Sequence, residues 1–262
     1  MSDKKIAIIT GASSGIGLAA STTFLASDWN VFGVDLSPAP ESLMSNTTNF
    51  SFLKVDITQS DAPSQIVAAA KSAFSSSRIG ALLNVAGIMD KHAGVDKLLD
   101  ADWEKVMAVN LNAPVKLMRE VINDMKANGG GSIVNVCSKA SVSGAVAGAA
   151  YTASKHALFG ITKNTAWMYK DEGIRCNAIA PGGVIDTNIA KSSPPETWDM
   201  AAYAKIKPIH DVYADFYNLA PEKFPKSSNS ATHAAVLLFL ASDASAGVNG
   251  VLVPVDSGWS TL

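Results

Sequence analysis

Short apolar runs rich in β-branched residues alternate with longer helical patterns along almost the whole chain. The runs predict seven strands, at residues 5–9, 29–35, 50–55, 81–85, 132–137, 174–180 and 251–255. The segments between them predict helices at residues 17–26, 61–75, 100–127, 151–169 and 230–241. Strands that are separated by helices of this length form a parallel sheet through right-handed crossovers. The sequence therefore predicts an α/β fold, a doubly wound parallel sheet with helices on both faces.

The length of the chain sets the domain organisation. The chain has 262 residues, 48% of them hydrophobic, so it can bury a large core as one domain. Two small domains remain possible on length alone, but no internal repeat or low-complexity tract interrupts the pattern. We expect a single domain over residues 1–262, with an irregular lobe at residues 186–228 that covers the substrate.

Charge and cysteine content limit the partners. A net charge of -2 and a pI near 6.1 argue against a nucleic-acid or anionic-membrane surface, because such surfaces concentrate Lys and Arg. No apolar run approaches the roughly 18 to 20 residues that cross a bilayer. The chain begins without the apolar core of a signal peptide, and we expect Cys137 and Cys176 to be reduced thiols. The expectation is a soluble, cytoplasmic protein that binds neither nucleic acid nor membrane.

A glycine-rich segment, Thr10-Gly-Ala-Ser-Ser-Gly-Ile-Gly17, follows the first predicted strand and opens the first predicted helix. At such a junction a pyrophosphate meets free backbone N–H groups and the positive end of a helix dipole. Alone, the G-x-x-x-G-x-G spacing is more often a structural turn. Between a strand and a helix it predicts a dinucleotide site that includes Gly11, Ser14, Gly15, Ile16 and Gly17.

Tyr151 and Lys155 are four residues apart, so on a helix they share one face. A phenol with a pKa of about 10 is a poor acid or base at neutral pH. A neighbouring ammonium favours the phenolate, so we expect Lys155 to lower the pKa of Tyr151. A bare Y-x-x-x-K is usually a pair of surface residues, but here Ser138 ends a predicted strand thirteen residues before Tyr151.

Together, the glycine segment, Ser138, Tyr151 and Lys155 resemble the short-chain dehydrogenase/reductase family, and the resemblance runs from Lys4 to Gly258. It implies a Rossmann-type fold, a nicotinamide cofactor and a catalytic set of Asn110, Ser138, Tyr151 and Lys155. Asn110, a polar residue inside a long helix, resembles the family asparagine that kinks this helix and holds a water near the lysine. The Y-x-x-x-K spacing implies C=O reduction or alcohol oxidation, because relatives that reduce enoyl groups use a longer gap.

The end of the second strand indicates the choice of cofactor. Asp35 can accept hydrogen bonds from an adenosine ribose and would repel a 2′-phosphate. No Arg or Lys stands in the glycine segment or directly after Asp35, where Leu36 follows, so NAD(H) is expected over NADP(H). The alternative is that Asp35 caps a turn. By resemblance, Asp56 and Ile57 contact the adenine.

Two further segments resemble family cofactor elements. Asn84-Val-Ala-Gly87 resembles N-N-A-G, which implies cofactor contacts for Asn84, Ala86 and Gly87 and the loss of one sheet-bracing bond at Val85. Pro181 and Gly182 resemble the wall beside the nicotinamide. Thr187 lies five residues after Gly182 where the family usually has four, so either Val184 or Ile185 could bond to the carboxamide.

The lobe indicates the substrate. It lacks a cluster of Arg or Lys that would hold a carboxylate or phosphate, and it carries Trp198, Met200, Tyr203, Tyr213, Phe216, Tyr217 and Phe224. We expect an apolar or cyclic secondary alcohol or its ketone, although these side chains could instead anchor the lobe to the core. Two other functions stay open: a non-redox lyase, isomerase or cyclase on the same scaffold, and an NAD-binding regulator without turnover.

The histidines and the long helices complete the expectations. His92, His156, His210 and His233 are scattered without ligand spacing, so no metal site is expected and surface or capping roles are favoured. His92 could border the site. The resemblance also implies a homo-oligomer, with a tetramer favoured, in which helices 100–127 and 151–169 pair with their copies.

Overall fold

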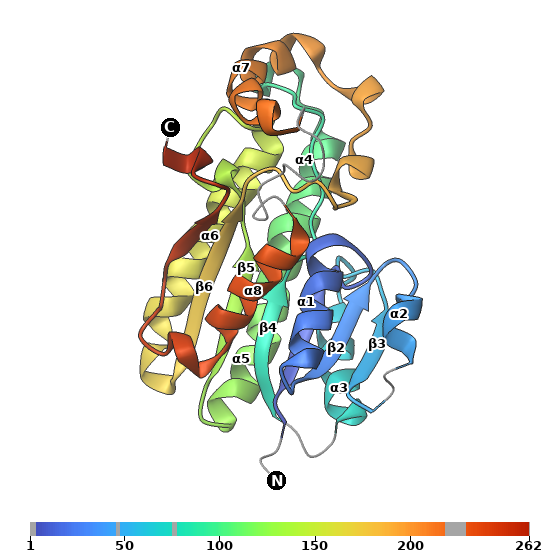
Figure 1. Cartoon of the computed structure of the whole chain (residues 1–262), viewed down its shortest axis with the longest axis vertical. Helices are drawn as coiled ribbons and strands as arrows, with labels where there is room; N and C mark the ends of the chain where they lie inside the picture. Colours follow the sequence, from blue (N-terminus) through green and yellow to red (C-terminus); the bar gives the residue numbers. More distant parts are fainter. Residues whose placement is uncertain (1–3, 46–47, 75–77, 218–228, 262) are drawn as a thin grey trace.

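The structure, a computed structural model, describes residues 4–45, 48–74, 78–217 and 229–261, with the backbone alone for 212–217. One parallel sheet has the strand order β3-β2-β1-β4-β5-β6-β7 (Figure 1). Its strands are β1 Ile6–Thr10, β2 Asn30–Asp35, β3 Phe50–Lys54, β4 Ile79–Asn84, β5 Gly131–Val136, β6 Ile174–Pro181 and β7 Leu252–Val255. The predicted doubly wound sheet is confirmed. The strand order reverses between β1 and β4, which is where such folds bind ligands.

Helices cover both faces of the sheet, which explains the continuous apolar strands. Along β1 the side chains alternate: Ile6 and Ile8 join one core cluster, and Ala7 and Ile9 join the other. The first cluster includes residues of α3 Ala62–Ala73, α5 Ala113–Ala127 and α6 Ala149–Met168. The second includes residues of α1 Gly15–Ala26 and α8 Ser230–Ala241, which pack together in front of the sheet in Figure 1.

The predicted helix at 100–127 is interrupted. It consists of α4 Asp100–Met107, a π-helical turn at Ala108–Asn112, and α5. Asn110 lies in this turn and is fully buried. A short helix, α2 Glu41–Met44, was not expected. The end of the predicted helix at residue 75 lies outside the described residues.

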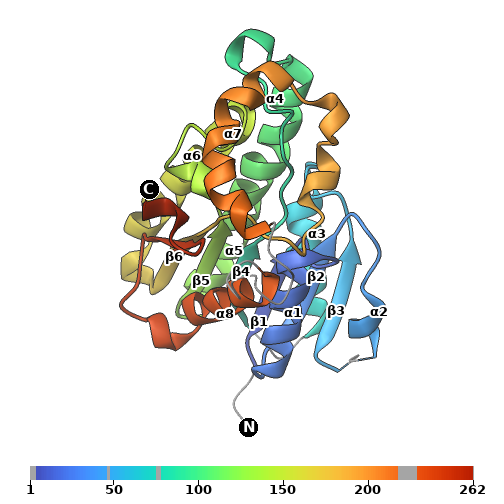
Figure 2. The same cartoon turned by 45° about the horizontal axis from the view of Figure 1, so that its top comes forward.

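The expectation of an irregular lobe at 186–228 is wrong for its central part. Residues Met200–Tyr217 form the helix α7. Its first half is rich in Ala, Lys and Met, which favour helices, whereas Pro208 inside it is a residue that normally ends one. Residues 218–228 lie outside the described part of the chain. Figures 1 and 2 show α7 above the carboxyl ends of the strands, so the lobe faces the region where the fold binds ligands.

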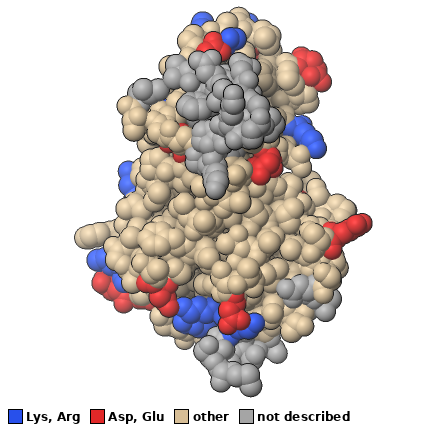
Figure 3. All heavy atoms as spheres, viewed as in Figure 1, with Lys and Arg blue, Asp and Glu red and all other residues tan. Residues whose placement is uncertain are grey.

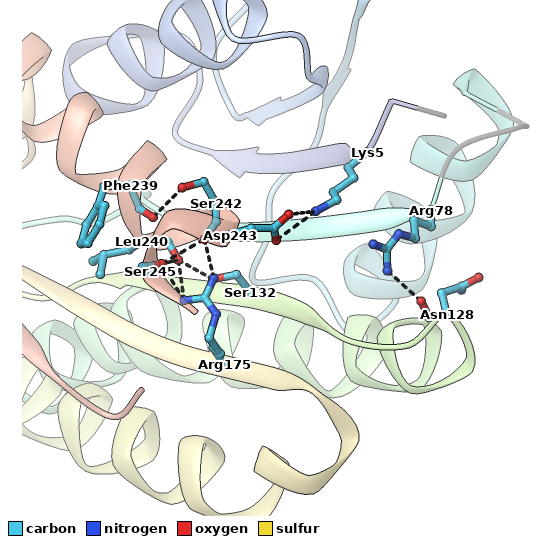
Figure 4. Close-up of polar contacts among 10 residues, drawn as sticks. All are labelled: Lys5, Arg78, Asn128, Ser132, Arg175, Phe239, Leu240, Ser242, Asp243 and Ser245. Atoms are coloured by element: carbon cyan, nitrogen blue, oxygen red, sulfur yellow. Dashed lines mark hydrogen bonds and ion pairs between the residues drawn. The ribbon is translucent and has the colours of Figure 1, made fainter. Parts of the chain in front are cut away.

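The amino ends of the strands carry structural polar contacts (Figure 4). The Arg175 guanidinium donates to the carbonyls of Leu240 (2.9 Å) and Ser242 (2.9 Å). Ser132 Oγ donates to the same Leu240 oxygen at 2.8 Å. These donors satisfy the last carbonyls of α8, where a cation is also favoured by the helix dipole. This end of the sheet is therefore closed by the protein itself.

On the face in Figure 3, basic and acidic side chains are interspersed, and much of the face is uncharged. Within the described ranges, none of the helices combines the length and the apolar character that crossing a bilayer requires.

Candidate active site

A cavity of about 780 Å³ lies at the carboxyl ends of the strands. Most of the predicted site residues line it, although they come from loops far apart in the sequence. Those in the lining are Gly11, Ser14, Gly15, Ile16, Gly17, Asp35, Leu36, Asp56, Ile57, Ala86, Gly87, Ser138, Tyr151, Lys155, Pro181, Gly182, Val184 and Thr187. Asn84, Asn110 and Ile185 are the predicted residues that do not line it.

The glycine segment is shaped for a close backbone approach. Gly11 has φ +71, and a Cβ there would lie 3.0 Å from the Ala86 nitrogen. A Cβ on Gly17 would lie 2.0 Å from the Gly11 oxygen, so only glycine fits where α1 meets the loop. At the start of α1, Ser14 makes no side-chain capping hydrogen bond, and the first turn has no acidic residue. The N-terminus of α1 therefore suits an anionic pyrophosphate in the cavity.

Asp35 connects the glycine segment with the end of β2. Its carboxylate accepts hydrogen bonds from the backbone N–H groups of Ser13 (3.0 Å) and Ser37 (2.9 Å). These bonds match the alternative that Asp35 caps a turn, yet the residue also lines the cavity beside the exposed Leu36. Further along the edge, hydrogen bonds from Thr58 hold the pKa of Asp56 below its usual value.

Asn84, a predicted cofactor contact, does not line the cavity, and its role at the cofactor stays a prediction. Asn84 is buried, and its Nδ2 donates to Asn135 Oδ1 at 2.8 Å, so it braces β4 against β5. The loop after β4 is held instead by Thr10, whose Oγ1 accepts from the nitrogens of Val85 (3.0 Å) and Ala86 (3.1 Å). The spacing of the motif in the sequence did not show whether the Asn84 side chain lies between β4 and β5 or at their carboxyl ends.

Ser138, Tyr151 and Lys155 meet on one wall of the cavity. Ser138 lies two residues after the end of β5, and a hydrogen bond joins it to Tyr151. The Lys155 ammonium lies 5.6 Å from the centre of the Tyr151 ring, and Nζ donates to the Val136 oxygen at 2.8 Å. The structure therefore brings together a phenol, a hydroxyl and an ammonium, which are the groups that polarise and protonate a carbonyl.

The expected lowering of the Tyr151 pKa by Lys155 is not found in this structure. Burial raises the pKa of Tyr151 to about 12, although the hydrogen bond from Ser138 acts in the opposite direction. Burial also lowers the pKa of Lys155 to about 8. Desolvation penalises the charged form of each group, and it is the largest cause of both shifts in pKa.

The Asn110 side chain forms hydrogen bonds with the backbone of the loop that lies near Lys155. Its Oδ1 accepts from the Ile88 nitrogen at 2.9 Å, and its Nδ2 donates to the Ile88 oxygen at 2.9 Å. A Cβ on Gly87 would lie 3.4 Å from Asn110 Oδ1 and 3.5 Å from Lys155 Nζ. Asn110 thus holds the loop that borders the lysine, and its role in a water relay stays a prediction.

The open choice between Val184 and Ile185 has a structural answer in position. Val184 lines the cavity, whereas Ile185 is 42% exposed and does not. Thr187 Oγ1 donates to the Val184 oxygen at 3.2 Å, so the two residues form one turn beside Pro181 and Gly182.

The expectation that the histidines lie at the surface is wrong for two of them. His92 and His233 are buried, because His92 packs against Trp198 and His233 bonds to the Asn229 and Val255 oxygens. His210 lines the cavity, which scattered spacing did not reveal. Among the described residues, no three His, Cys, Asp or Glu side chains could hold a metal.

Of the aromatic and Met side chains of the lobe that the structure describes, one lines the cavity. Tyr203 lines the cavity, whereas the Trp198 ring packs against His92 outside the lobe, its Nε1 donates to the Ser193 oxygen within the lobe, and Met200 is exposed. The side chains of Tyr213, Phe216, Tyr217 and Phe224 lie outside the described residues. Further apolar lining residues that the sequence did not single out are Ile88, Met89, Val146, Ile189 and Trp259.

Lys139 is a second buried lysine in the lining, directly after Ser138. Its ammonium donates to the Trp259 oxygen and lies 4.8 Å from the centre of the Trp259 ring. This contact holds the C-terminal segment against the cavity. Neither residue carried a recognisable signal, because they are 120 positions apart.

Comparison with known proteins decides the family. Residues 5–198 match the short chain dehydrogenase family. The chain belongs to this family. Short chain dehydrogenase ple7 of Rhodocybe pseudopiperita is 50% identical, over 98% of this chain and 99% of that protein. Asnovolin H dehydrogenase nvfC of Aspergillus novofumigatus is 45% identical, over 98% and 97%. The crystal structure of a levodione reductase matches with a TM-score of 0.81 at 29% identity, over 98% of both chains.

As a short-chain dehydrogenase, the chain is an oxidoreductase of a family that binds a nicotinamide cofactor. The glycine segment and the uncapped start of α1 fit its pyrophosphate, and Asp35 lines the same cavity. The predicted family is confirmed, together with its fold.

The burial of Lys155 predicts a pH-dependent stability. The folded short-chain dehydrogenase releases this proton near a pKa of about 8, whereas the ordinary lysine pKa is 10.5. Between these values the unfolded chain binds more protons, so the Lys155 contribution to the free energy of unfolding rises with pH. We expect wild type to gain stability relative to Lys155→Met between about pH 7.5 and about pH 9.5 in urea unfolding.

The quantity to follow is the difference in the free energy of unfolding between wild type and Lys155→Met, because the two cysteines are present in both proteins. Burial raises the pKa of Cys137 and of Cys176, and each therefore lowers stability as pH rises above their ordinary value of 9.0. A wild-type advantage that stays constant with pH would contradict the assignment to Lys155.

Proposed function

We propose that this short-chain dehydrogenase interconverts a secondary alcohol and a ketone with NAD(H) as its cofactor. The observation that carries the proposal is the convergence of Ser138, Tyr151 and Lys155 on a cavity that also reaches the uncapped start of α1. A carbonyl bound at this wall would lie between the two hydroxyl groups and the cofactor. No competing function has a comparable group of side chains in support.

The roles of the side chains follow from their protonation. Ser138 and Tyr151 would donate hydrogen bonds to the substrate carbonyl oxygen, and Tyr151 would give its proton to the developing alkoxide. The nicotinamide supplies or accepts the hydride. A raised pKa keeps Tyr151 protonated at neutral pH, which favours the donor role in ketone reduction. In the opposite direction the tyrosinate would remove the alcohol proton, with Lys155 binding the ribose hydroxyls.

The cavity lining supports an apolar or cyclic substrate. Met89, Val146, Ile189 and Trp259 supply apolar contacts around the open end. The two lysines of the lining are already engaged, Lys139 with the Trp259 oxygen and Lys155 with the Val136 oxygen. The described residues of the lining include no arginine, so a phosphate or carboxylate would lack the bidentate partner that commonly binds it. Two similar proteins are named for asnovolin H and for levodione, and we infer that this chain also acts on one discrete compound.

Replacing the acid/base group tests the reaction. We expect Tyr151→Phe to lose about three orders of magnitude in kcat, because a general acid contributes roughly 10² to 10⁴. Binding of NADH, followed by its fluorescence, should persist because the ring remains. Tyr169→Phe, at the end of the same helix and outside the lining, is the matched control and should keep wild-type activity. Retention of about a tenth of wild-type kcat by Tyr151→Phe would refute the role.

An assay of NADH absorbance with a panel of substrates separates the remaining alternatives. The panel contains cyclic and aromatic ketones with their alcohols, a polyol and a 3-oxoacyl thioester. A polyol or thioester preferred by about tenfold in kcat/KM would overturn the apolar substrate and leave the catalytic residues standing. Tight NADH binding without turnover of any compound would favour the regulator or the non-redox scaffold.

Cofactor preference depends on Asp35. We expect wild type to favour NAD in kcat/KM, and Asp35→Ala with Leu36→Arg to shift the preference toward NADP. The substitution removes a carboxylate that repels a phosphate and adds a guanidinium that binds it. Asp28→Ala, in an exposed ion pair with Lys4, should leave the ratio unchanged. A wild type that prefers NADP would rule the assignment out.

We also propose assembly as a homotetramer through α4 with α5, and through α6. Exposed apolar side chains on these helices support it: Trp103 on α4 and Trp167 and Met168 on α6. Burying them against a second copy would remove this surface from water. Light scattering should give about four times the 27.2 kDa of one chain, and a monomer would contradict the proposal.

A further inference from the structure

The helix that carries Tyr151 has no capping side chain of its own. Gly148 occupies the N-cap of α6, and the first turn contains no acidic residue. Such a start leaves backbone N–H groups without helical partners. Tyr151 stands three residues after the N-cap, so its own N–H is one of them.

A carboxylate from a distant loop supplies the missing cap. Asp90 follows β4 and is 3% exposed. Its Oδ1 accepts from the Gly148 nitrogen at 3.0 Å, and its Oδ2 accepts from the Tyr151 nitrogen at 2.9 Å. Both carboxylate oxygens therefore lie on the first turn of α6. A negative charge there is also favoured by the helix dipole.

The glycine at position 148 is explained by the same contact. Its φ of -74 is open to any residue, so conformational freedom does not require glycine. A Cβ at this position, however, would lie 2.6 Å from Asp90 Oδ2 and 2.8 Å from the Ala93 nitrogen. Glycine is thus needed because Asp90 approaches the helix so closely.

The loop that holds Asp90 is fixed on both sides. Asp90 Oδ1 also accepts from the His92 nitrogen at 3.1 Å, and the Ala93 oxygen accepts from the Ala149 nitrogen at 2.9 Å. On the side of the lobe, Ser193 Oγ donates to the Asp90 backbone oxygen at 2.6 Å. Asp90 is therefore held against α6 by its carboxylate, and its backbone connects α6 to the lobe through Ser193.

The charge of Asp90 also acts on the Tyr151 phenol. Together with burial and Cys137, Asp90 raises the pKa of Tyr151, whereas the hydrogen bond from Ser138 lowers it. The other ionisable groups nearby are Lys155, which faces the Tyr151 ring, and His92, which lies beside Asp90. Removing the carboxylate would therefore alter the ionisation of Tyr151 as well as the position of its helix.

We propose that Asp90 is a positioning residue for Tyr151, whose carboxylate replaces the N-cap side chain of α6 and fixes the phenol beside Ser138. The inference rests on the proposed role of Tyr151 as acid/base. Asp90 does not line the cavity, so it acts through the helix and not by contact with substrate or cofactor.

The test is Asp90→Asn, which preserves size but removes the charge and one acceptor. We expect kcat to fall about 10- to 100-fold, because a displacement of about 1 Å at a reacting group costs this much. The KM for NADH should stay within about twofold, since no cofactor contact is lost. In the oxidative direction, the apparent pKa of the kcat profile should move to lower pH, because the tyrosinate no longer faces a negative charge.

Asp124→Asn is the matched control. Asp124 is a buried carboxylate on α5 that pairs with Lys71, away from the cavity. The Asp124→Asn variant should be less stable than wild type, and its dependence of kcat on pH should be unchanged. Gly148→Ala is the second variant, because it keeps the Asp90 charge but pushes the carboxylate away from α6. It should lower kcat with a smaller shift in apparent pKa.

The outcomes separate this inference from the proposed function. Wild-type kcat in Asp90→Asn or in Gly148→Ala would overturn it. So would a loss of kcat that matches the loss of folded protein, measured by circular dichroism, with an unshifted profile. If Tyr151→Phe is active in the same assay, the proposed function fails instead. If Tyr151→Phe is inactive while Asp90→Asn is normal, only the role of Asp90 fails.

Discussion

The burial of the Lys155 ammonium is the constraint on which the site depends. A buried charge is costly unless neighbouring groups solvate it, and here the Val136 oxygen accepts its hydrogen bond. Gly87 leaves the space above Nζ open, and Asn110 holds the loop that contains Gly87. The π-helical turn that places Asn110 breaks an otherwise regular helix. An arrangement that is unfavourable for packing alone is typical of a functional site.

The hydrogen bonds at the helix ends differ between the two ends of the sheet. At the amino ends of the strands, Arg175 and Ser132 donate to the Leu240 carbonyl near the end of α8. At the carboxyl ends, Asp90 caps α6, whereas Ser14 leaves the start of α1 without a side-chain cap. A carboxylate of the protein thus caps the helix that carries Tyr151, whereas the start of α1, beside the cavity, has no side-chain cap.

Sequence reasoning recovered what local pattern determines. Apolar runs predicted the strands, and short-range spacing placed Tyr151, Lys155 and the glycine segment in one cavity. It failed where distant segments decide the outcome. Asp90 reaches α6 across 58 residues, and Lys139 reaches Trp259 across 120. The helix α7 was not expected within the lobe, and Pro208 lies inside it. The Asn84 side chain lies between β4 and β5, a direction that spacing does not give.

The same limit explains the error in the Tyr151 pKa. Spacing on a helix predicts a phenol beside an ammonium, but it contains no information on how much water surrounds them. In the folded chain, desolvation acts on both groups. It raises the pKa of Tyr151 to about 12, against the expected direction, and it lowers the pKa of Lys155 to about 8. At neutral pH the phenol therefore keeps its proton and the lysine keeps its charge. In the proposed reaction that state would donate a proton to an alkoxide, whereas alcohol oxidation would require a further positive charge, which an oxidised nicotinamide would supply.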